Sequence, residues 1–161
     1  MNCIIIFNFI LTVVEINLST ATEILYVLPD NSTNITCPSQ PCATLSQYTL
    51  NNGTLPVVSN VEYHFLPGEH HVPANMTLQN LHNLSIIGTN IITTSSPVML
   101  VGCLQSHVFN IINSHYVTIS NVMFKHCGGL NTKFTNLKVT CCFSCKIENV
   151  TFYNMDSQGL T

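Results

Sequence analysis

Three histidines and a glutamate lie close together in the stretch HFLPGEHHV, and side chains of these types can bind metal ions. His64, Glu69, His70 and His71 provide imidazole and carboxylate groups, which are common zinc ligands. Adjacent side chains of a strand point to opposite faces, so at most one of His70 and His71 can lie beside His64. We therefore expect a solvated turn here, and the sequence predicts no metal site and no cofactor.

Cysteines are the second group of reactive side chains, and all but Cys3 of the eight follow residue 21. The CxxC spacing of Cys142 and Cys145 is found in zinc sites, but disulfides are favoured in an oxidising compartment. We expect a Cys37–Cys42 pair across a short loop, different partners for Cys141 and Cys142, and bonds that tie the insertion at 125–140 to the domain. The disulfide candidates, whose odd number leaves one without an intrachain partner, are Cys37, Cys42, Cys103, Cys127, Cys141, Cys142 and Cys145.

The first 21 residues predict a secretory signal peptide. An apolar run over 3–14 precedes the small residues Ser19 and Ala21, and we expect cleavage after Ala21. The run is short for a membrane span, which argues against an anchor. It also lacks the positive charge that usually precedes a signal peptide's apolar run, so the alternatives are an uncleaved anchor and a buried strand or helix. A secreted or extracellular cell-surface protein also fits the glycosylation candidates downstream, which are Asn31, Asn34, Asn52, Asn75, Asn83 and Asn149.

The chain carries few charges. Apolar residues make up 46% of it and charged residues 7%, which predicts one folded domain. There is no arginine, and the basic residues are Lys125, Lys133, Lys138 and Lys146. Such a set cannot form a phosphate-binding patch, so nucleic acid is excluded as a partner.

Two kinds of local structure are expected along the mature chain. Residues 22–60 read as an N-terminal cap region with the small disulfide loop and a short helix, in which Leu45 and Tyr48 share a face and Thr44 is the N-cap. From residue 61 to 161 the sequence repeats a strand, a single-residue corner and a second strand. The corner residues are Gly68, Gly88, Asn121 and Asn149, all of types that readily adopt a left-handed conformation.

The repeats predict an all-β fold, a parallel β-helix solenoid of about four coils. A corner residue in the left-handed region shifts the side-chain alternation by one, so Ile119 and Val122 can both point inward. Spacings of 20, 33 and 28 residues between corners imply loops at 93–107 and 125–138. A β-sandwich of short strands is the alternative architecture.

Interior and exterior positions follow from this alternation. Methionines and phenylalanines are expected as stacked interior rows, and they are Met76, Met99, Met123, Met155, Phe124, Phe134, Phe143 and Phe152. Polar residues are expected on an outward sheet face, and they are Thr118, Ser120, Glu148 and Thr151. Asn121 and Asn149 should stack their amides inside one corner, an arrangement that would exclude a glycan on Asn149.

The phrases VEYHFLPGEHHV, LHNLSIIG, VTISNVMF and KIENVTF resemble the coils of right-handed β-helix proteins of the pectin-lyase-like superfamily. The opening CPSQPCATLSQYTLN is similar to the amino-terminal region of uncharacterised extracellular β-helix proteins of invertebrate animals. The resemblance covers about residues 25–155, and it implies a right-handed β-helix. Its members include enzymes, adhesins and proteins of unknown role, so it implies no single function.

The enzymes of this superfamily use a basic side chain beside acidic calcium ligands, or a cluster of aspartates. This chain has only Asp30 and Asp156 as aspartates, so no catalytic residue is assigned. We expect a non-enzymatic recognition or structural module that binds extracellular glycans or proteins. The alternative is the N-terminal part of a carbohydrate-active enzyme, a lyase or hydrolase, whose catalytic coils lie beyond Thr161. The chain is expected to be a fragment of a longer precursor, with any membrane attachment in the missing C-terminal region.

Overall fold

The computed structural model describes residues 22–30, 35–49, 59–73, 76–89, 97–102, 107–126 and 135–153. Strands dominate these ranges, which confirms the all-β prediction. The elements are β1 (Glu23–Leu28), β2 (Cys42–Thr44), α1 (Leu45–Tyr48), β3 (Ser59–Phe65), β4 (Gly68–Val72), β5 (Thr77–Gln79), β6 (His82–Gly88), β7 (Val98–Gly102), β8 (His107–Ser120), β9 (Met123–His126), β10 (Thr135–Phe143), β11 (Lys146–Glu148) and β12 (Thr151–Tyr153).

Several predicted features lie outside the described residues. They are the signal peptide at 1–21, the glycosylation candidates Asn31, Asn34, Asn52 and Asn75, the cysteines Cys103 and Cys127, and the interior candidates Phe134 and Met155.

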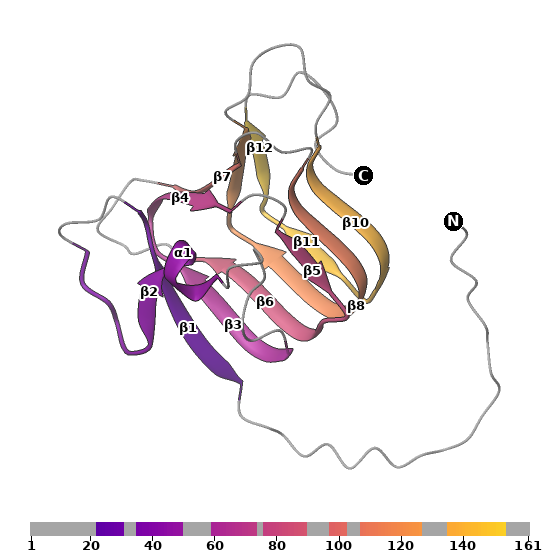
Figure 1. Cartoon of the computed structure of the whole chain (residues 1–161), viewed down its shortest axis with the longest axis horizontal. Helices are drawn as coiled ribbons and strands as arrows, with labels where there is room; N and C mark the ends of the chain where they lie inside the picture. The colour runs from indigo at the N-terminus through magenta and orange to yellow at the C-terminus, as the bar shows by residue number, and fades with distance from the viewer. Residues whose placement is uncertain are drawn as a thin grey trace.

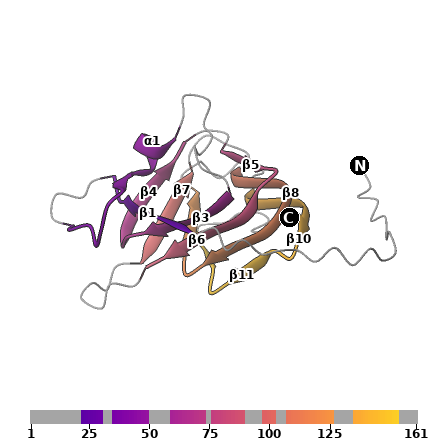
Figure 2. The same ribbon diagram turned by 90° about the horizontal axis from the view of Figure 1, so that it is seen from below.

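The strands form two sheets, and every strand pairing among the described residues is parallel. The larger sheet has the order β10-β8-β6-β3-β1-β2, with β5 and β11 also paired to β8, and the smaller has the order β12-β9-β7-β4. Figure 1 shows β1, β3, β6, β8 and β10 of the larger sheet in chain order from indigo to yellow, with β2 outside β1, and Figure 2 shows the same stack from below. A β-sandwich is built from antiparallel strands, so that alternative is wrong, and the arrangement is compatible with a β-helix.

Identical registers bring apolar residues of successive strands into rows. One row runs through paired positions of β1, β3, β6, β8 and β11, and its members are Leu25, Tyr63, Ile86, Ile119 and Ile147. The first four are at most 4% exposed, so the row runs through the core. The predicted alternation about Asn121 also holds, because Val117, Ile119, Val122 and Phe124 are all buried.

Left-handed backbone conformations recur at equivalent positions of neighbouring strands. One row of such corners has φ values of 55°, 53°, 54° and 53° and consists of Asn60, Asn83, Tyr116 and Ser144. A second row has φ values of 56°, 48° and 53° and consists of Asn80, Asn113 and Cys141. Stacked corners of this kind bend each strand at the same level, which keeps the registers aligned.

A third corner contains Asn121 and Asn149, which have the left-handed φ values, 57° and 49°, that the sequence predicts. The prediction is wrong for Gly88, the last residue of β6, because it does not have a left-handed φ. Gly88 lies at the level of Asn121, since the preceding Ile87 is paired with Ser120. A Cβ atom there would collide with the Asn121 carbonyl, so glycine is needed for close approach of two backbones. Gly68 has a φ of 133° but begins β4, and the residue paired with Gly88 is Phe65. The first repeat is therefore 23 residues long instead of 20.

The predicted loop at 93–107 contains β7, whose Val98, Leu100 and Val101 are at most 3% exposed. The expectation of an insertion without strands is therefore wrong for this part. β9 and β10 likewise occupy both ends of the predicted loop at 125–138. Short apolar runs such as VMLVG lack the alternation by which exposed strands are recognised, because a strand covered on both sides needs none.

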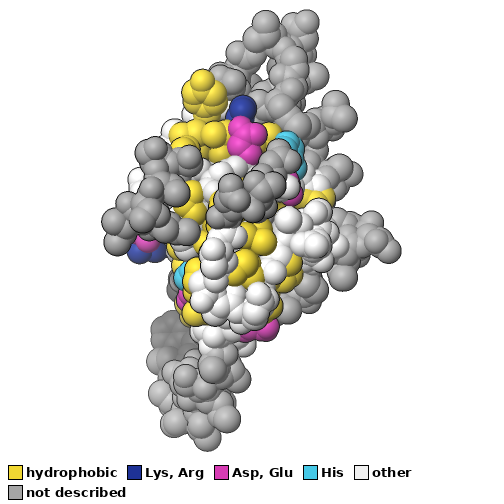
Figure 3. All heavy atoms as spheres, turned by 90° about the vertical axis from the view of Figure 1, so that its left-hand side faces the viewer, with side chains coloured by type: hydrophobic (Ala, Val, Ile, Leu, Met, Phe, Trp, Pro, Cys, Tyr) yellow, Lys and Arg dark blue, Asp and Glu magenta, His cyan; other side chains and the backbone are white. Residues whose placement is uncertain are grey.

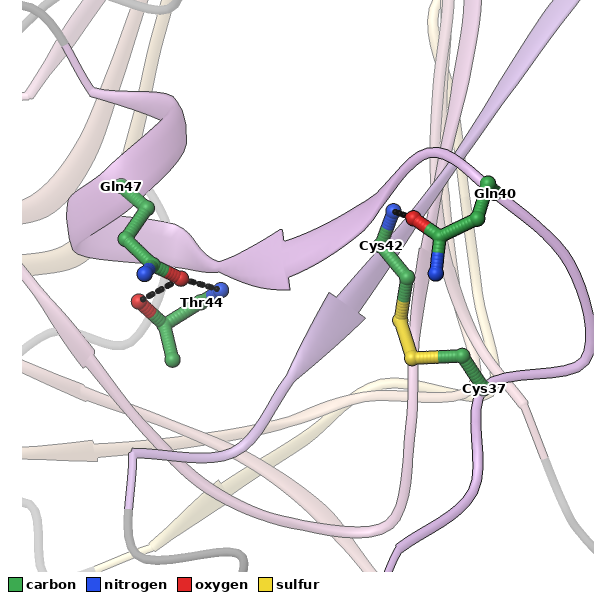
Figure 4. Close-up of a disulfide and its surroundings, with 5 residues drawn as sticks. All are labelled: Cys37, Gln40, Cys42, Thr44 and Gln47. Atoms are coloured by element: carbon green, nitrogen blue, oxygen red, sulfur yellow. Dashed lines mark hydrogen bonds between the residues drawn. A yellow bond between two sulfur atoms is a disulfide. The ribbon is translucent and has the colours of Figure 1, made fainter.

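The cap region contains the predicted short helix and disulfide, but it also contributes β1 and β2 to the larger sheet. Helix α1 begins after Thr44, whose backbone N–H donates to Oε1 of Gln47 at 2.8 Å (Figure 4). Leu45 of the helix is fully buried against the core. Cys37 and Cys42 form a disulfide with Cα atoms 6.2 Å apart, and it closes the loop that leads into β2 (Figure 4).

Candidate binding surface

Four aromatic side chains line up across β6, β8 and β10 on the outside of the larger sheet. His82 is paired in register with His115, and His115 is paired with Phe143. Their ring centroids are 6.3 Å and 6.0 Å apart. Tyr116 stands beside this row, and its ring is nearly perpendicular to those of His82 and Phe143, with centroids 5.4 Å and 6.3 Å away. We call these four residues the aromatic ladder.

The rings of the aromatic ladder are open to solvent. Phe143 is 62% exposed and Tyr116 48% exposed, and both histidines are exposed as well. Single exposed apolar residues are common on protein surfaces, but a contiguous row is typical of an interaction site. The residues that flank the rings along the chain are uncharged, and they are Leu81, Asn83, Ser114, Val117, Cys142 and Ser144.

Stacked corners hold the aromatic ladder in place. The left-handed residues Asn80, Asn113 and Cys141 precede the ring row, and Asn83, Tyr116 and Ser144 follow it. Between the two corners each strand contributes one inward residue, such as the buried Ser114, and one outward ring. Ser114 Oγ donates to the Ile112 carbonyl at 2.8 Å and accepts from the Leu81 N–H at 3.3 Å, which ties β8 to β6 beneath the rings.

The sequence prediction missed this surface and assigned Phe143 to an interior row, which is wrong. Phe143 lies two residues after the left-handed Cys141, and a corner at a cysteine is not expected from residue type. Met99 and Met123 are likewise only partly buried, whereas Met76 is in the core. The aromatic ladder nevertheless has a sequence signal, because its members at 82, 115 and 143 repeat the 33- and 28-residue spacings of the predicted corners.

The polar outward face is only partly as expected. Thr118 is partly exposed and Glu148 and Thr151 are exposed, but Ser120 is only 5% exposed. Ser120 is paired with Ile87 of β6 on one side and with Glu148 of β11 on the other.

The four candidate metal ligands are divided between two sheets. His64 is on β3, where Nε2 lies 2.8 Å from Oε2 of Glu62, and Glu69 pairs with Lys125 at 3.2 Å. His71 Nδ1 lies 3.0 Å from Oδ2 of Asp30, on the outside of β4. Within the described residues no group of three or more histidine, cysteine or acidic side chains could hold a metal ion.

His70 contradicts the expected solvated turn, because it is on strand β4 and fully buried. Its Nε2–H donates to the Leu66 carbonyl at 2.7 Å. Its ring is nearly perpendicular to the Phe65 ring, and the two centroids are 5.0 Å apart. Burial lowers the pKa of His70, while the Leu66 carbonyl and the charge of Asp30 oppose that shift. Adjacent His70 and His71 do point to opposite faces, as the strand alternation requires.

The cysteines near the aromatic ladder are joined in disulfides. Cys142 and Cys145 pair with each other, with Cα atoms 5.8 Å apart. This bond closes a loop between β10 and β11, so it does not tie a long insertion to the domain as expected. Cys141 is disulfide-bonded too, and its partner is not its neighbour Cys142.

Two glycosylation candidates, Asn83 and Asn149, lie within the described residues, and both side chains are exposed. Asn83 donates its amide to Oδ1 of Asn60 at 3.0 Å, and Asn149 donates its amide to Oδ1 of Asn121 at 2.7 Å. The amide stacking expected at Asn121 and Asn149 is therefore present, but at a corner that faces solvent.

Comparison with known proteins gives no relative: no family model, no curated protein and no solved structure matches the chain. No helix within the described ranges is long and apolar enough to cross a membrane.

Proposed function

We propose that the chain is a right-handed parallel β-helix and a non-catalytic recognition module of a secreted or cell-surface glycoprotein. It binds a neutral, extended glycan on the aromatic ladder. The solenoid supports this proposal because each coil repeats an equivalent position, so that a chain of similar sugar units meets a row of similar side chains. Parallel pairing throughout the described strands and the stacked corners favour the β-helix.

The observation that carries the proposed function is the exposed row His82, His115 and Phe143 with Tyr116 beside it. Aromatic faces pack against the C–H faces of a sugar ring, and they lose little conformational entropy because the rings are held by only two rotatable bonds. The two imidazoles and the phenol can exchange hydrogen bonds with sugar hydroxyls. The ladder thus combines stacking and hydrogen-bonding groups on one side of the sheet.

A neutral ligand is favoured by the small number of unpaired positive charges among the described residues. Lys125 is paired with Glu69 at 3.2 Å, and Lys146 is paired with Glu148 at 2.8 Å. On the face drawn in Figure 3, the few lysine side chains lie beside acidic ones. An acidic polysaccharide would need a row of unpaired cations, and the aromatic ladder contains neither lysine nor arginine.

An extracellular location is supported by the disulfides Cys37–Cys42 and Cys142–Cys145, since such bonds persist in oxidising compartments. The likeness of the four strand phrases to pectin-lyase-like coils supports the right-handed form of the β-helix. A second reason is that connections between parallel strands are right-handed almost without exception.

The proposal is tested with the full chain, secreted from a eukaryotic host, on an array of immobilised neutral and acidic glycans. Phe143→Ala and Tyr116→Ala should each weaken binding about tenfold, the effect of losing one stacked ring. Tyr153→Ala is the matched control, because Tyr153 is 51% exposed on β12 and outside the aromatic ladder. Equal binding by all three variants would exclude the ladder as the site. New reducing or unsaturated ends in the bound glycans would instead favour the enzyme alternative.

A further inference from the structure

A hollow of about 160 Å³ opens at the corner where Asn149 lies. Pro97, Val122 and Met123 give it an apolar side, and Asn121, Asn149 and Thr151 give it a polar side. Asn149 and Thr151 are both exposed, so the hollow leads to solvent. Apolar and amide walls together suit a sugar that carries an acetamido group, because such a sugar has both C–H faces and strong hydrogen-bonding groups.

Asn149 and Thr151 also belong to the sequon Asn149-Val150-Thr151. In N-glycosylation, Nδ2 of the asparagine forms a bond to C1 of the first sugar of a lipid-diphosphate-linked oligosaccharide. The C1–O bond breaks, the lipid diphosphate leaves with its electron pair, and Nδ2 gives up one of its two protons to solvent. The other N–H remains, so a glycosylated Asn149 can still donate to Oδ1 of Asn121, as it does at 2.7 Å. The paired amide at this exposed corner is therefore compatible with a glycan, in contrast to the expectation from sequence.

We propose that Asn149 carries an N-linked glycan whose first N-acetylhexosamine fills this hollow. Asn121 holds the linkage amide through Oδ1, and Val122 and Met123 pack against the sugar. The glycan thereby clamps β12 to β9, which are paired through Thr151 and Met123. This inference rests on the proposed secretion, since only a chain that enters the secretory pathway meets the oligosaccharide donor.

Asn83 provides an internal comparison. It has a sequon completed by Ser85, a left-handed φ of 53° and an amide that donates to Oδ1 of Asn60. It repeats the local geometry of Asn149, but it does not line the hollow. A glycan on Asn83 should therefore project into solvent without a seat for its first sugar.

The test begins with glycopeptide mapping of the full chain from a eukaryotic secretory host. Native protein is then treated with a peptide amidase that cuts the glycan–asparagine bond, and release is timed at each site. We expect release at Asn149 to be at least about tenfold slower than at Asn83, and the two rates to become equal after denaturation. Equal release rates at the two sites in the native protein would refute the proposal that the first sugar on Asn149 occupies the hollow.

Stability gives a second measurement. Thr151→Ala removes the sequon without changing Asn149, and Ser85→Ala does the same for Asn83. The effect of each substitution is measured in glycosylated protein and in protein made without glycans. Thr151→Ala should lower the melting temperature by about 2 to 4 °C more in the glycosylated protein, whereas Ser85→Ala should have the same effect in both. Trimming every glycan to one sugar should preserve the difference, and its loss on trimming would overturn a role of the first sugar.

Site occupancy separates this inference from the proposed function. Glycans on other sequons with an empty Asn149 would refute the inference and leave the proposed secretion in place. A secretory product without a glycan on any sequon would count against both.

Discussion

Asn149 donates its side-chain amide to Oδ1 of Asn121 at 2.7 Å, across 28 residues of sequence and between equivalent positions of neighbouring strands. Both residues have left-handed φ values. The same relation joins Asn83 to Asn60 at 3.0 Å, at another corner of the larger sheet. Asparagine is suited to this place because it tolerates the left-handed region and its amide can donate and accept at once.

Substitutions of Asn121 should separate the hydrogen bond from the backbone conformation. Asn121→Gly removes the amide but tolerates the φ of 57°, and we expect it to cost about 1 kcal/mol of unfolding free energy. Asn121→Ala loses both the amide and the conformational preference, so it should cost about 1 kcal/mol more. Denaturant unfolding of the two variants measures the difference. Equal stability of both would mean that the left-handed corner carries no conformational cost.

The contact between Gly88 and Asn121 predicts a larger effect. A Cβ atom at Gly88 would overlap the Asn121 carbonyl, and neither backbone can move without shifting a paired strand. Gly88→Ala should therefore lower the unfolding free energy by about 3 kcal/mol or prevent folding. Gly102→Ala is a milder comparison, because its Cβ would meet a methyl group of Val108 at 2.7 Å. If Gly102→Ala were more destabilising than Gly88→Ala, the backbones at Gly88 and Asn121 would have to separate at little cost.

The core was largely predictable from sequence, because alternation of apolar residues identifies the inward face of a half-covered strand. Ile119 and Val122 were assigned in this way, and both are buried. Strands β5 and β7 were missed, since short or continuously apolar segments carry no such period. The corners were only partly predictable, because Tyr116 and Ser144 are left-handed despite residue types that disfavour it. Tyr116 lies between the corners at Asn83 and Ser144, so stacking of neighbouring corners accounts for these conformations.

The aromatic ladder was not predicted because its rings are distant in sequence. His82, His115 and Phe143 become neighbours only once the registers of β6, β8 and β10 are fixed. The left-handed conformation of Cys141 was not predicted either, and without it the side chain of Phe143 was expected to point inward. The hollow at Asn149 depends in the same way on three segments that are distant in sequence, and no local pattern indicates it.

The Cys37–Cys42 disulfide should contribute measurably to stability. It closes a loop of sequence separation 5 before β2, which is paired with β1 at the end of the larger sheet. By loop-closure entropy, replacing both cysteines with serine should lower the unfolding free energy by about 2 kcal/mol. Denaturant unfolding of the double variant, compared with the oxidised parent, tests this value. An unchanged midpoint would mean that the unfolded loop is already as restricted as the bonded one.

His70 should make the fold sensitive to mild acid. Burial is the main cause that lowers its pKa below the ordinary value of 6.5, so the folded protein keeps the imidazole neutral while the unfolded chain takes up a proton. The folded state therefore binds fewer protons below about pH 6.5, and its stability is present above that pH and lost as the pH falls toward the lowered pKa. In this window the loss approaches about 1.4 kcal/mol per pH unit.

The variant His70→Leu tests this pH dependence. Leucine suits the position, because His70 is paired in register with Leu100 of β7 and is fully buried. The variant loses the hydrogen bond to the Leu66 carbonyl, so its stability at pH 8 should fall by about 1 kcal/mol. Between pH 7 and pH 5, however, its unfolding free energy should decline less steeply than that of the parent. The charges of Asp30 and His71 also act on this imidazole, and both residues are present in the two proteins, so the comparison isolates the contribution of His70. Parallel curves for the two proteins would exclude His70 as the group responsible.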